Sequence, residues 1–199
     1  EKEIVQKLCG LGLDGVQLVA YKVLPDARYV QGGVSVSSAR KVAETFVSAG
    51  KSIPLIGAYF NPVHPDKEKV ETGGAVFRDY LRLAHDFGCD TVGSETGSVN
   101  GDPWIYHPGN HTQEAFDRVV NIFAGLCDYA KDYKVYVGME GAIGHVCYDV
   151  GRLASAVDKI GRDNIRIIFD LYNYLDVSNI DKRYEILAQG LQTFGDRIC

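Results

Sequence analysis

The sequence predicts an α/β fold and, within that class, a (β/α)8 TIM barrel. Short apolar segments alternate with amphipathic segments of helical period, one strand and one helix in roughly 30 to 45 residues. No glycine-rich turn of the kind found in nucleotide-binding doubly wound sheets follows a predicted strand. Polar residues instead stand at the ends of successive predicted strands. Because the strands of a barrel all open onto one mouth, this placement favours the barrel.

The composition indicates a single domain over residues 1–199. With 46% hydrophobic residues the chain can bury one sizeable core, and no linker divides it. Its formal net charge of −5 argues against a nucleic acid or a membrane as partner, and no apolar run is long enough to span a bilayer. Five scattered cysteines without paired spacing indicate reduced, buried thiols, so we expect a cytoplasmic protein.

Five segments are predicted to be strands. Several of them are almost continuously apolar, as is typical of parallel strands that are covered on both faces. They are residues 15–20, 53–59, 90–95, 134–140 and 165–170.

Four segments between them are predicted to be helices: 38–49, 66–87, 112–132 and 149–160. In the third of these, apolar residues recur at three- and four-residue steps and so form one buried stripe. Thr112 can cap its start, because the hydroxyl can accept an otherwise unpaired backbone N–H. The pair Gly73-Gly74 weakens the first half of the second helix and predicts a later start.

Two carboxylates end neighbouring predicted strands. Glu140 closes one and Asp170 closes the next, so a barrel brings both to the same rim. Hard divalent cations take oxygen ligands of this kind, and the pair would begin a Mg²⁺ or Mn²⁺ site. The alternative is that each carboxylate caps the helix that follows it. His145 and Asn173 lie close behind in the sequence, which favours the metal site.

The segments 138–142 (GMEGA) and 168–173 (IFDLYN) resemble the fifth and sixth strands of sugar phosphate isomerase/epimerase proteins of the xylose isomerase-like barrel superfamily. The segment 11–18 is similar to the second strand of that family, and 88–92 to its fourth. The resemblance covers nearly the whole chain. It implies strands two to six of the barrel and, at 196–199, a stub of strand seven, so we expect a fragment without the first and the last two strands.

The resemblance also implies roles for individual residues. Glu140 and Asp170 match two metal ligands, which the family completes with a His from strand seven and a Glu from strand eight. Glu140 also matches one of a pair of acid/base carboxylates. The implied cofactor is a divalent metal, Mn²⁺ or Mg²⁺ first and Co²⁺ or Zn²⁺ as alternatives. Asn173 stands where many epimerases have a substrate-binding His, and it can still hydrogen-bond a sugar hydroxyl.

Other residues could contact a small sugar at the mouth. Glu95 ends a predicted strand and could bind hydroxyls, or it could be a solvated or turn-capping carboxylate. His145 lies in a loop over the mouth, either as a substrate contact or as an exposed loop histidine. Asn61 and His64 lie in the segment 61–65, where Pro62 and Pro65 stiffen the chain and indicate ordinary loop structure.

The residues Trp104, Tyr106 and His107 lie in the long loop 97–111. Long loops in compact domains are often functional, so these rings could cover the mouth and stack on a sugar. Packing of the same rings over the end of the barrel would give the same sequence pattern. Trp104 is therefore a candidate substrate contact with a structural alternative.

The leading hypothesis is a metal-dependent isomerase or epimerase of a keto-sugar or related small polyol, working by carboxylate-mediated proton transfer. One rival is a metal-dependent lyase or dehydratase on the same barrel, and another is a barrel that binds sugar without catalysis. The related endonuclease barrels are disfavoured, because they need a histidine cluster and a basic groove. A small sugar is the expected partner, and a homo-oligomer is left open.

Overall fold

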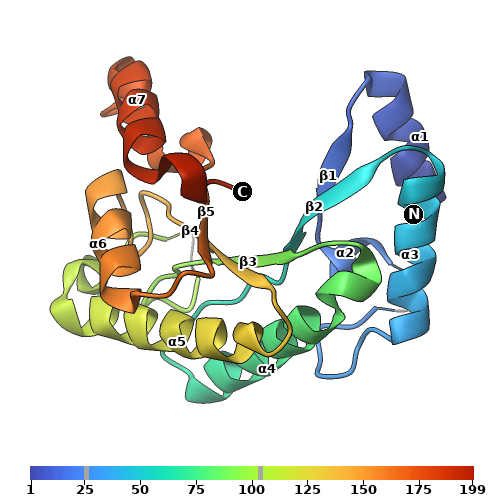
Figure 1. Cartoon of the computed structure of the whole chain (residues 1–199). Helices are drawn as coiled ribbons and strands as arrows, with labels where there is room; N and C mark the ends of the chain where they lie inside the picture. Colours follow the sequence, from blue (N-terminus) through green and yellow to red (C-terminus); the bar gives the residue numbers. More distant parts are fainter. Residues whose placement is uncertain (25–26, 103–104) are drawn as a thin grey trace.

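A computed structural model describes the chain except residues 25–26 and 103–104. Its centre is one parallel sheet of five strands that neighbour one another in chain order, as successive strands of a β/α barrel do (Figure 1). The strands are β1 (Gly15–Leu18), β2 (Ser52–Gly57), β3 (Thr91–Glu95), β4 (Tyr136–Glu140) and β5 (Ile165–Ile168). The predicted fold class is confirmed, and each predicted strand corresponds to an observed one.

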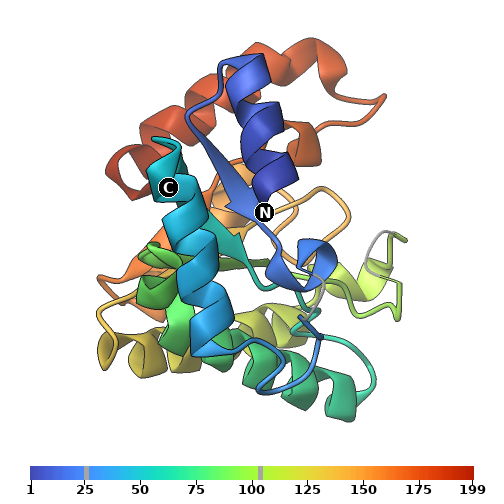
Figure 2. The same cartoon turned by 90° about the vertical axis from the view of Figure 1, so that its right-hand side faces the viewer.

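Helices cover the outer side of the curved sheet (Figures 1 and 2). The longer ones are α1 (Lys2–Leu11), α3 (Val36–Ser48), α4 (Lys67–Leu83), α5 (Gln113–Lys131), α6 (Val150–Ile160) and α7 (Arg183–Phe194). The short elements are α2 (Ala20–Val23), η1 (Ala84–Phe87), η2 (Pro108–His111), η3 (Leu171–Tyr174), η4 (Ile180–Lys182) and η5 (Gly195–Arg197). The four predicted helices are all present, whereas the pattern did not single out α1 or α7. The Oγ1 atom of Thr112 accepts the N–H of Ala115, as the predicted cap requires.

The prediction that the glycine pair delays the second helix is wrong. α4 begins at Lys67, and the carboxylate of Asp66 caps it by accepting the N–H of Glu68. Gly73 has a packing role, because a Cβ there would lie 2.5 Å from the Cβ of Phe60. The missing side chain lets α4 approach the chain that follows β2.

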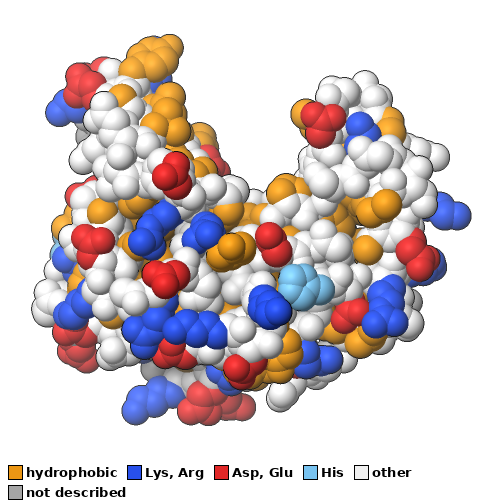
Figure 3. All heavy atoms as spheres, viewed as in Figure 1, with side chains coloured by type: hydrophobic (Ala, Val, Ile, Leu, Met, Phe, Trp, Pro, Cys, Tyr) orange, Lys and Arg blue, Asp and Glu red, His pale blue; other side chains and the backbone are white. Residues whose placement is uncertain are grey.

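The main core lies between the sheet and the helices. Its largest fully buried members include Phe77 of α4, Phe123 of α5 and Met139 of β4. On the inner side of the sheet, Gly93 and Gly138 face each other in register and leave room for the side chain of Ile168. Figure 3 shows the molecule hollowed on this inner side, between the part that carries α7 and the part that carries α1.

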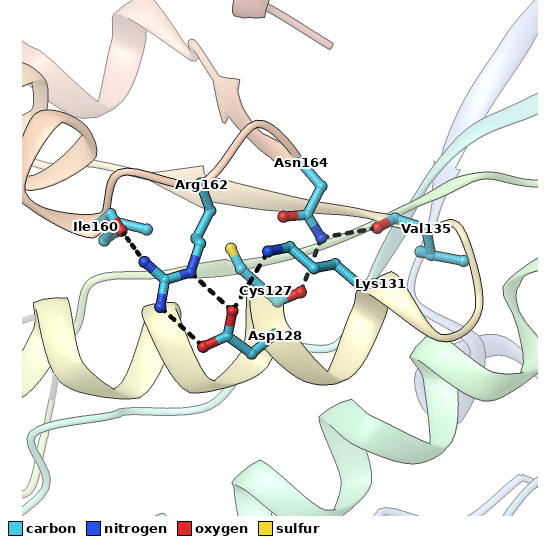
Figure 4. A network of polar contacts seen from close by, with 7 residues as sticks. All are labelled: Cys127, Asp128, Lys131, Val135, Ile160, Arg162 and Asn164. Atoms are coloured by element: carbon cyan, nitrogen blue, oxygen red, sulfur yellow. Dashed lines mark hydrogen bonds and ion pairs between the residues drawn. The ribbon is translucent and has the colours of Figure 1, made fainter.

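A polar network fixes the approach to β5 (Figure 4). Arg162 forms two hydrogen bonds with the carboxylate of Asp128 on α5, at 2.7 and 2.9 Å. The amide of Asn164 donates to the carbonyls of Cys127 and Val135. These contacts tie the segment before β5 to both α5 and the start of β4, and so they help to set where β5 enters the sheet.

The last residues begin another pairing. Ile198 forms a parallel bridge with Ile167 of β5, and the N–H of Cys199 donates to the carbonyl of Ile167. Of the residues predicted to open a further strand, 196–199, Ile198 and Cys199 pair with β5, whereas Asp196 and Arg197 belong to η5. The prediction of buried thiols is wrong for Cys9 and Cys199, which are exposed, and all five cysteines are free. Among the described residues, no helix is long and apolar enough to cross a membrane.

Candidate functional site

The candidate site lies at the carboxyl ends of the strands. Glu95 and Glu140 are the last residues of β3 and β4, and they are partners in the parallel register. Partners in a parallel pair direct their side chains to the same face of the sheet. The loops that follow are joined as well, because the N–H of Thr96 donates to the carbonyl of Glu140. Two carboxyl groups therefore stand side by side on the inner face.

Glu140 is held by hydrogen bonds to both of its carboxylate oxygens. The hydroxyl of Tyr59 donates to Oε2 at 2.8 Å, and the amide of Asn173 donates to Oε1 at 2.7 Å. The amide of Gln17 in turn donates to the Tyr59 hydroxyl. Only 5% of Glu140 is exposed, so the carboxylate has a fixed orientation within a largely dry site.

The surroundings raise the pKa of both carboxyls. For Glu140, burial raises the pKa most, the Tyr59 hydrogen bond lowers it, and the charge of Asp170 raises it again. For Glu95, burial and then the charge of Glu140 raise the pKa to about 7, while Lys22 on α2 lowers it. Carboxyls whose pKa is raised toward neutrality are typical of proton-transfer sites.

Asp170 is placed differently from the prediction. β5 ends at Ile168, and Asp170 lies beyond it as the exposed cap of η3. Its Oδ1 atom accepts the N–H of Tyr172 at 3.0 Å, so the capping alternative is realised for this residue. Asp170 is nevertheless close enough to raise the pKa of Glu140.

The oxygen donors of Glu140 and Asp170 fit a hard divalent cation, which also relieves the repulsion between two neighbouring carboxylates. They fit it as part of a ligand set. In the described part of the chain, no group of three or more His, Cys, Asp and Glu residues gathers in a way that could hold a metal.

His145 and Asn173 both line a hollow beside the carboxylates. The hollow has a volume of about 520 Å³ and lies between the loops that follow β4 and β5. His145 is 1% exposed and lines it, so the alternative of an exposed loop histidine is wrong. Asn173 lines the hollow and also holds Glu140, which makes it the link between the two regions.

The remaining predicted residues have mixed outcomes. Asn61 is structural, since its amide donates to the carbonyls of Ser98 and Asn100 and its Oδ1 accepts the N–H of Val63. His64 is buried, and its Nδ1 accepts the N–H of Asp66. Tyr106 lines the hollow. Trp104 lies outside the described residues.

Sequence reasoning missed Tyr59 and Gln17. Tyr59 follows β2 by two residues, and Gln17 is the third residue of β1. A signal was available, because both are polar-ended side chains close to the carboxyl ends of predicted strands. The contacts of Gln17 with Tyr59 and of Tyr59 with Glu140 depend on the curvature of the sheet, which residue spacing alone does not reveal.

A family model described as xylose isomerase-like TIM barrel matches residues 5–198. No curated protein matches the sequence.

Solved structures share the fold at low sequence identity. A D-psicose 3-epimerase with D-fructose has a TM-score of 0.71 at 16% identity, over 99% of this chain and 65% of that one. A probable 3-DHS dehydratase of Bacillus anthracis has a TM-score of 0.69 at 15% identity, over 98% of this chain and 64% of that one. The IOLI protein with a zinc atom has a TM-score of 0.72 at 16% identity, over 98% of this chain and 65% of that one. The chain thus spans slightly less than two thirds of these structures.

Proposed function

This chain belongs to the xylose isomerase-like TIM barrel family, and we propose that it carries one side of the active site of a divalent-metal-dependent sugar isomerase or epimerase. The substrate is a keto-sugar or a related small polyol. One observation carries the proposal: Glu140 is buried at the carboxyl end of β4, with both oxygens hydrogen-bonded and with Glu95 beside it. The D-psicose 3-epimerase of the same fold supports this reaction class.

In the proposed reaction, Glu140 removes a proton from the substrate carbon next to a carbonyl. Tyr59 and Asn173 orient its two oxygens and, by donating to them, stabilise the ionised form and so oppose the effect of burial on its pKa. Glu95 accepts hydrogen bonds from substrate hydroxyls.

Glu140 and Asp170 would hold the metal, Mn²⁺ or Mg²⁺ first and Co²⁺ or Zn²⁺ as alternatives. When bound, such an ion polarises the carbonyl and the neighbouring hydroxyl and so makes the adjacent C–H more acidic. The zinc atom bound by the IOLI protein, which has the same fold, supports a divalent metal as the cofactor.

The test is proton exchange. The full-length protein is incubated with Mn²⁺ and a panel of ketohexoses (D-fructose, D-psicose, D-tagatose) in D₂O, and loss of the C–H signal is followed by NMR. We expect Glu140→Gln to lower exchange by about 10²-fold or more. Glu44→Gln on the exposed face of α3 is the matched control and should exchange as the parent does. Retained exchange in Glu140→Gln would refute the acid/base assignment.

A second candidate is a dehydratase, favoured by the similarity to the probable 3-DHS dehydratase. Epimerisation and dehydration both begin with removal of a proton next to a carbonyl, so Glu140 serves either reaction. They differ in the product: a dehydratase releases water, whereas an isomerase conserves the mass of its substrate. Mass spectrometry of the product separates the two. A third outcome is that the Glu140→Gln variant binds sugar with the same affinity as the parent and that the parent shows no turnover. That outcome would indicate a barrel that binds sugar without catalysis.

A further inference from the structure

The hollow beside Glu140 is lined largely by rings, and it is called the aromatic hollow below. Its volume of about 520 Å³ lies in the range of small-molecule binding sites and exceeds the volume of a few water molecules. The rings come from the loops after β3, β4 and β5, that is, from the carboxyl side of the sheet. Its ring-bearing residues are Tyr106, His111, His145, Tyr148 and Tyr172.

The rings support one another. The His111 ring lies 4.2 Å from the Tyr148 ring and 5.7 Å from the Tyr106 ring, measured between centroids. Arg152 packs its guanidinium on the Tyr148 ring, and its nitrogen atoms donate to the carbonyls of Val146 and Thr112. Arg152 therefore holds the Tyr148 ring in place. Tyr172, by contrast, is 81% exposed, so its ring is accessible to a ligand in the hollow.

The charge of the hollow selects against an anion. Asp176 is part of its lining, and hydrogen bonds from Ser178 lower the pKa of this carboxyl, so it is ionised at neutral pH. No Lys or Arg occurs among the described residues that line the hollow. A phosphate would meet a negative charge without a cation to balance it. The C–H faces of a neutral sugar ring suit aromatic side chains, and the sugar hydroxyls suit Asp176 and Asn173.

The hollow adjoins the proposed reaction centre. The amide of Asn173 donates to Oε1 of Glu140, while the same residue lines the hollow. Its carbonyl accepts the N–H of Ile143, which joins the loops after β4 and β5 beneath the hollow. A molecule with one unit against Glu140 would place its next unit in the aromatic hollow.

We propose that the aromatic hollow is a second sugar subsite, which binds the neutral glycosyl ring of a substrate whose reacting unit lies against Glu140. The inference rests on the proposed function and narrows its substrate class to neutral glycosides, in place of free monosaccharides or sugar phosphates.

The test measures binding, which does not depend on turnover. Isothermal titration calorimetry of the metal-loaded full-length protein compares two neutral disaccharides, maltose and cellobiose, with D-glucose and with D-glucose 6-phosphate. We expect at least one disaccharide to bind about 10-fold more tightly than either single-ring sugar. Tyr172→Ala should weaken that disaccharide by about 2- to 12-fold, as for the loss of one aromatic contact, and leave D-glucose nearly unchanged.

Tyr184→Ala is the matched control, because Tyr184 is a similarly exposed tyrosine on α7 that is not part of the hollow. Exposed side chains are dispensable for folding, so both variants should fold. The inference is overturned if the two tyrosine variants weaken the disaccharide equally, if neither disaccharide binds, or if D-glucose 6-phosphate binds most tightly. Repeating the titration with Glu140→Gln separates the two proposals: disaccharide binding that persists there supports the subsite whatever the outcome of the proton-exchange assay.

Discussion

Glu95 and Glu140 are register partners at the ends of β3 and β4, so two carboxyl groups whose pKa values are both raised share one face of the sheet. Each disfavours the charge of the other, and a proton or a cation stabilises the pair. Because of this relationship, the free energy of unfolding depends on pH.

The first prediction concerns Glu95. Its pKa of about 7 exceeds the ordinary value of 4.5, so the folded chain binds this proton more tightly than the unfolded chain does. The stabilisation is therefore complete below about pH 4.5 and is lost as the pH rises through 7, on the order of 3 kcal/mol in all. The variant Glu95→Gln has no carboxyl group to ionise here, so it does not lose this stabilisation as the pH rises. Urea unfolding of the chelator-treated protein should show the variant gaining on the parent from about pH 5 to about pH 8. An equal difference at both pH values would contradict it.

The second prediction concerns Tyr59→Phe. The Tyr59 hydroxyl donates to Oε2 of Glu140 and lowers its pKa, so the variant leaves that pKa higher. The acidic limb of the proton-exchange profile should move to higher pH, and the rate at neutral pH should fall by about 10-fold. Tyr129→Phe, whose hydroxyl contacts that of Tyr133 on the far side of the sheet, is the control. An unshifted profile in Tyr59→Phe would exclude the positioning role.

The third prediction concerns Asp170→Asn. The amide oxygen can still accept the N–H of Tyr172, so the cap of η3 and the melting temperature without metal should be preserved. The lost charge should weaken Mn²⁺ binding by about 10-fold or more. Thermal melts over a Mn²⁺ titration measure this, because at a given concentration an ion that binds more tightly raises the melting temperature further. Equal Mn²⁺ shifts in parent and variant would remove Asp170 from the ligand set.

The fourth prediction uses two adjacent glycines of α4. A Cβ at Gly73 would lie 2.5 Å from that of Phe60, whereas a Cβ at Gly74 meets only the end of Arg78 at 3.6 Å. Gly73→Ala should cost about 1–3 kcal/mol through overpacking. Gly74→Ala should gain about 0.5–1 kcal/mol, because alanine favours the helix. Denaturant unfolding of both variants measures the difference, and the reverse order would contradict the packing role.

Much of the fold follows from local patterns. The five strands and four of the helices were predictable, because parallel strands are continuously apolar and helices repeat their apolar positions. The start of α4 was not, because the value of Gly73 lies in its contact with Phe60, a residue of another element.

Within the candidate site, Glu140 was predictable from the sequence, whereas the residues around it were less so. Glu140 could be found, since it ends an apolar strand. Tyr59 and Gln17 could not be assigned to it, because Tyr59 reaches Glu140, and Gln17 reaches Tyr59, only through the curvature of the sheet. Asp170 is more exposed than predicted, since β5 ends two residues earlier and the chain turns into η3.

The partners of Glu140 have a consequence for the order in which the chain folds. Because the strands neighbour one another in chain order, most sheet contacts can form as soon as the next strand has been synthesised. Glu140 differs, since its hydrogen bonds come from Tyr59, 81 residues earlier, and from Asn173, 33 residues later. During synthesis the buried carboxylate thus acquires its second donor only after β5 has left the ribosome. The candidate site is completed later than the scaffold around it.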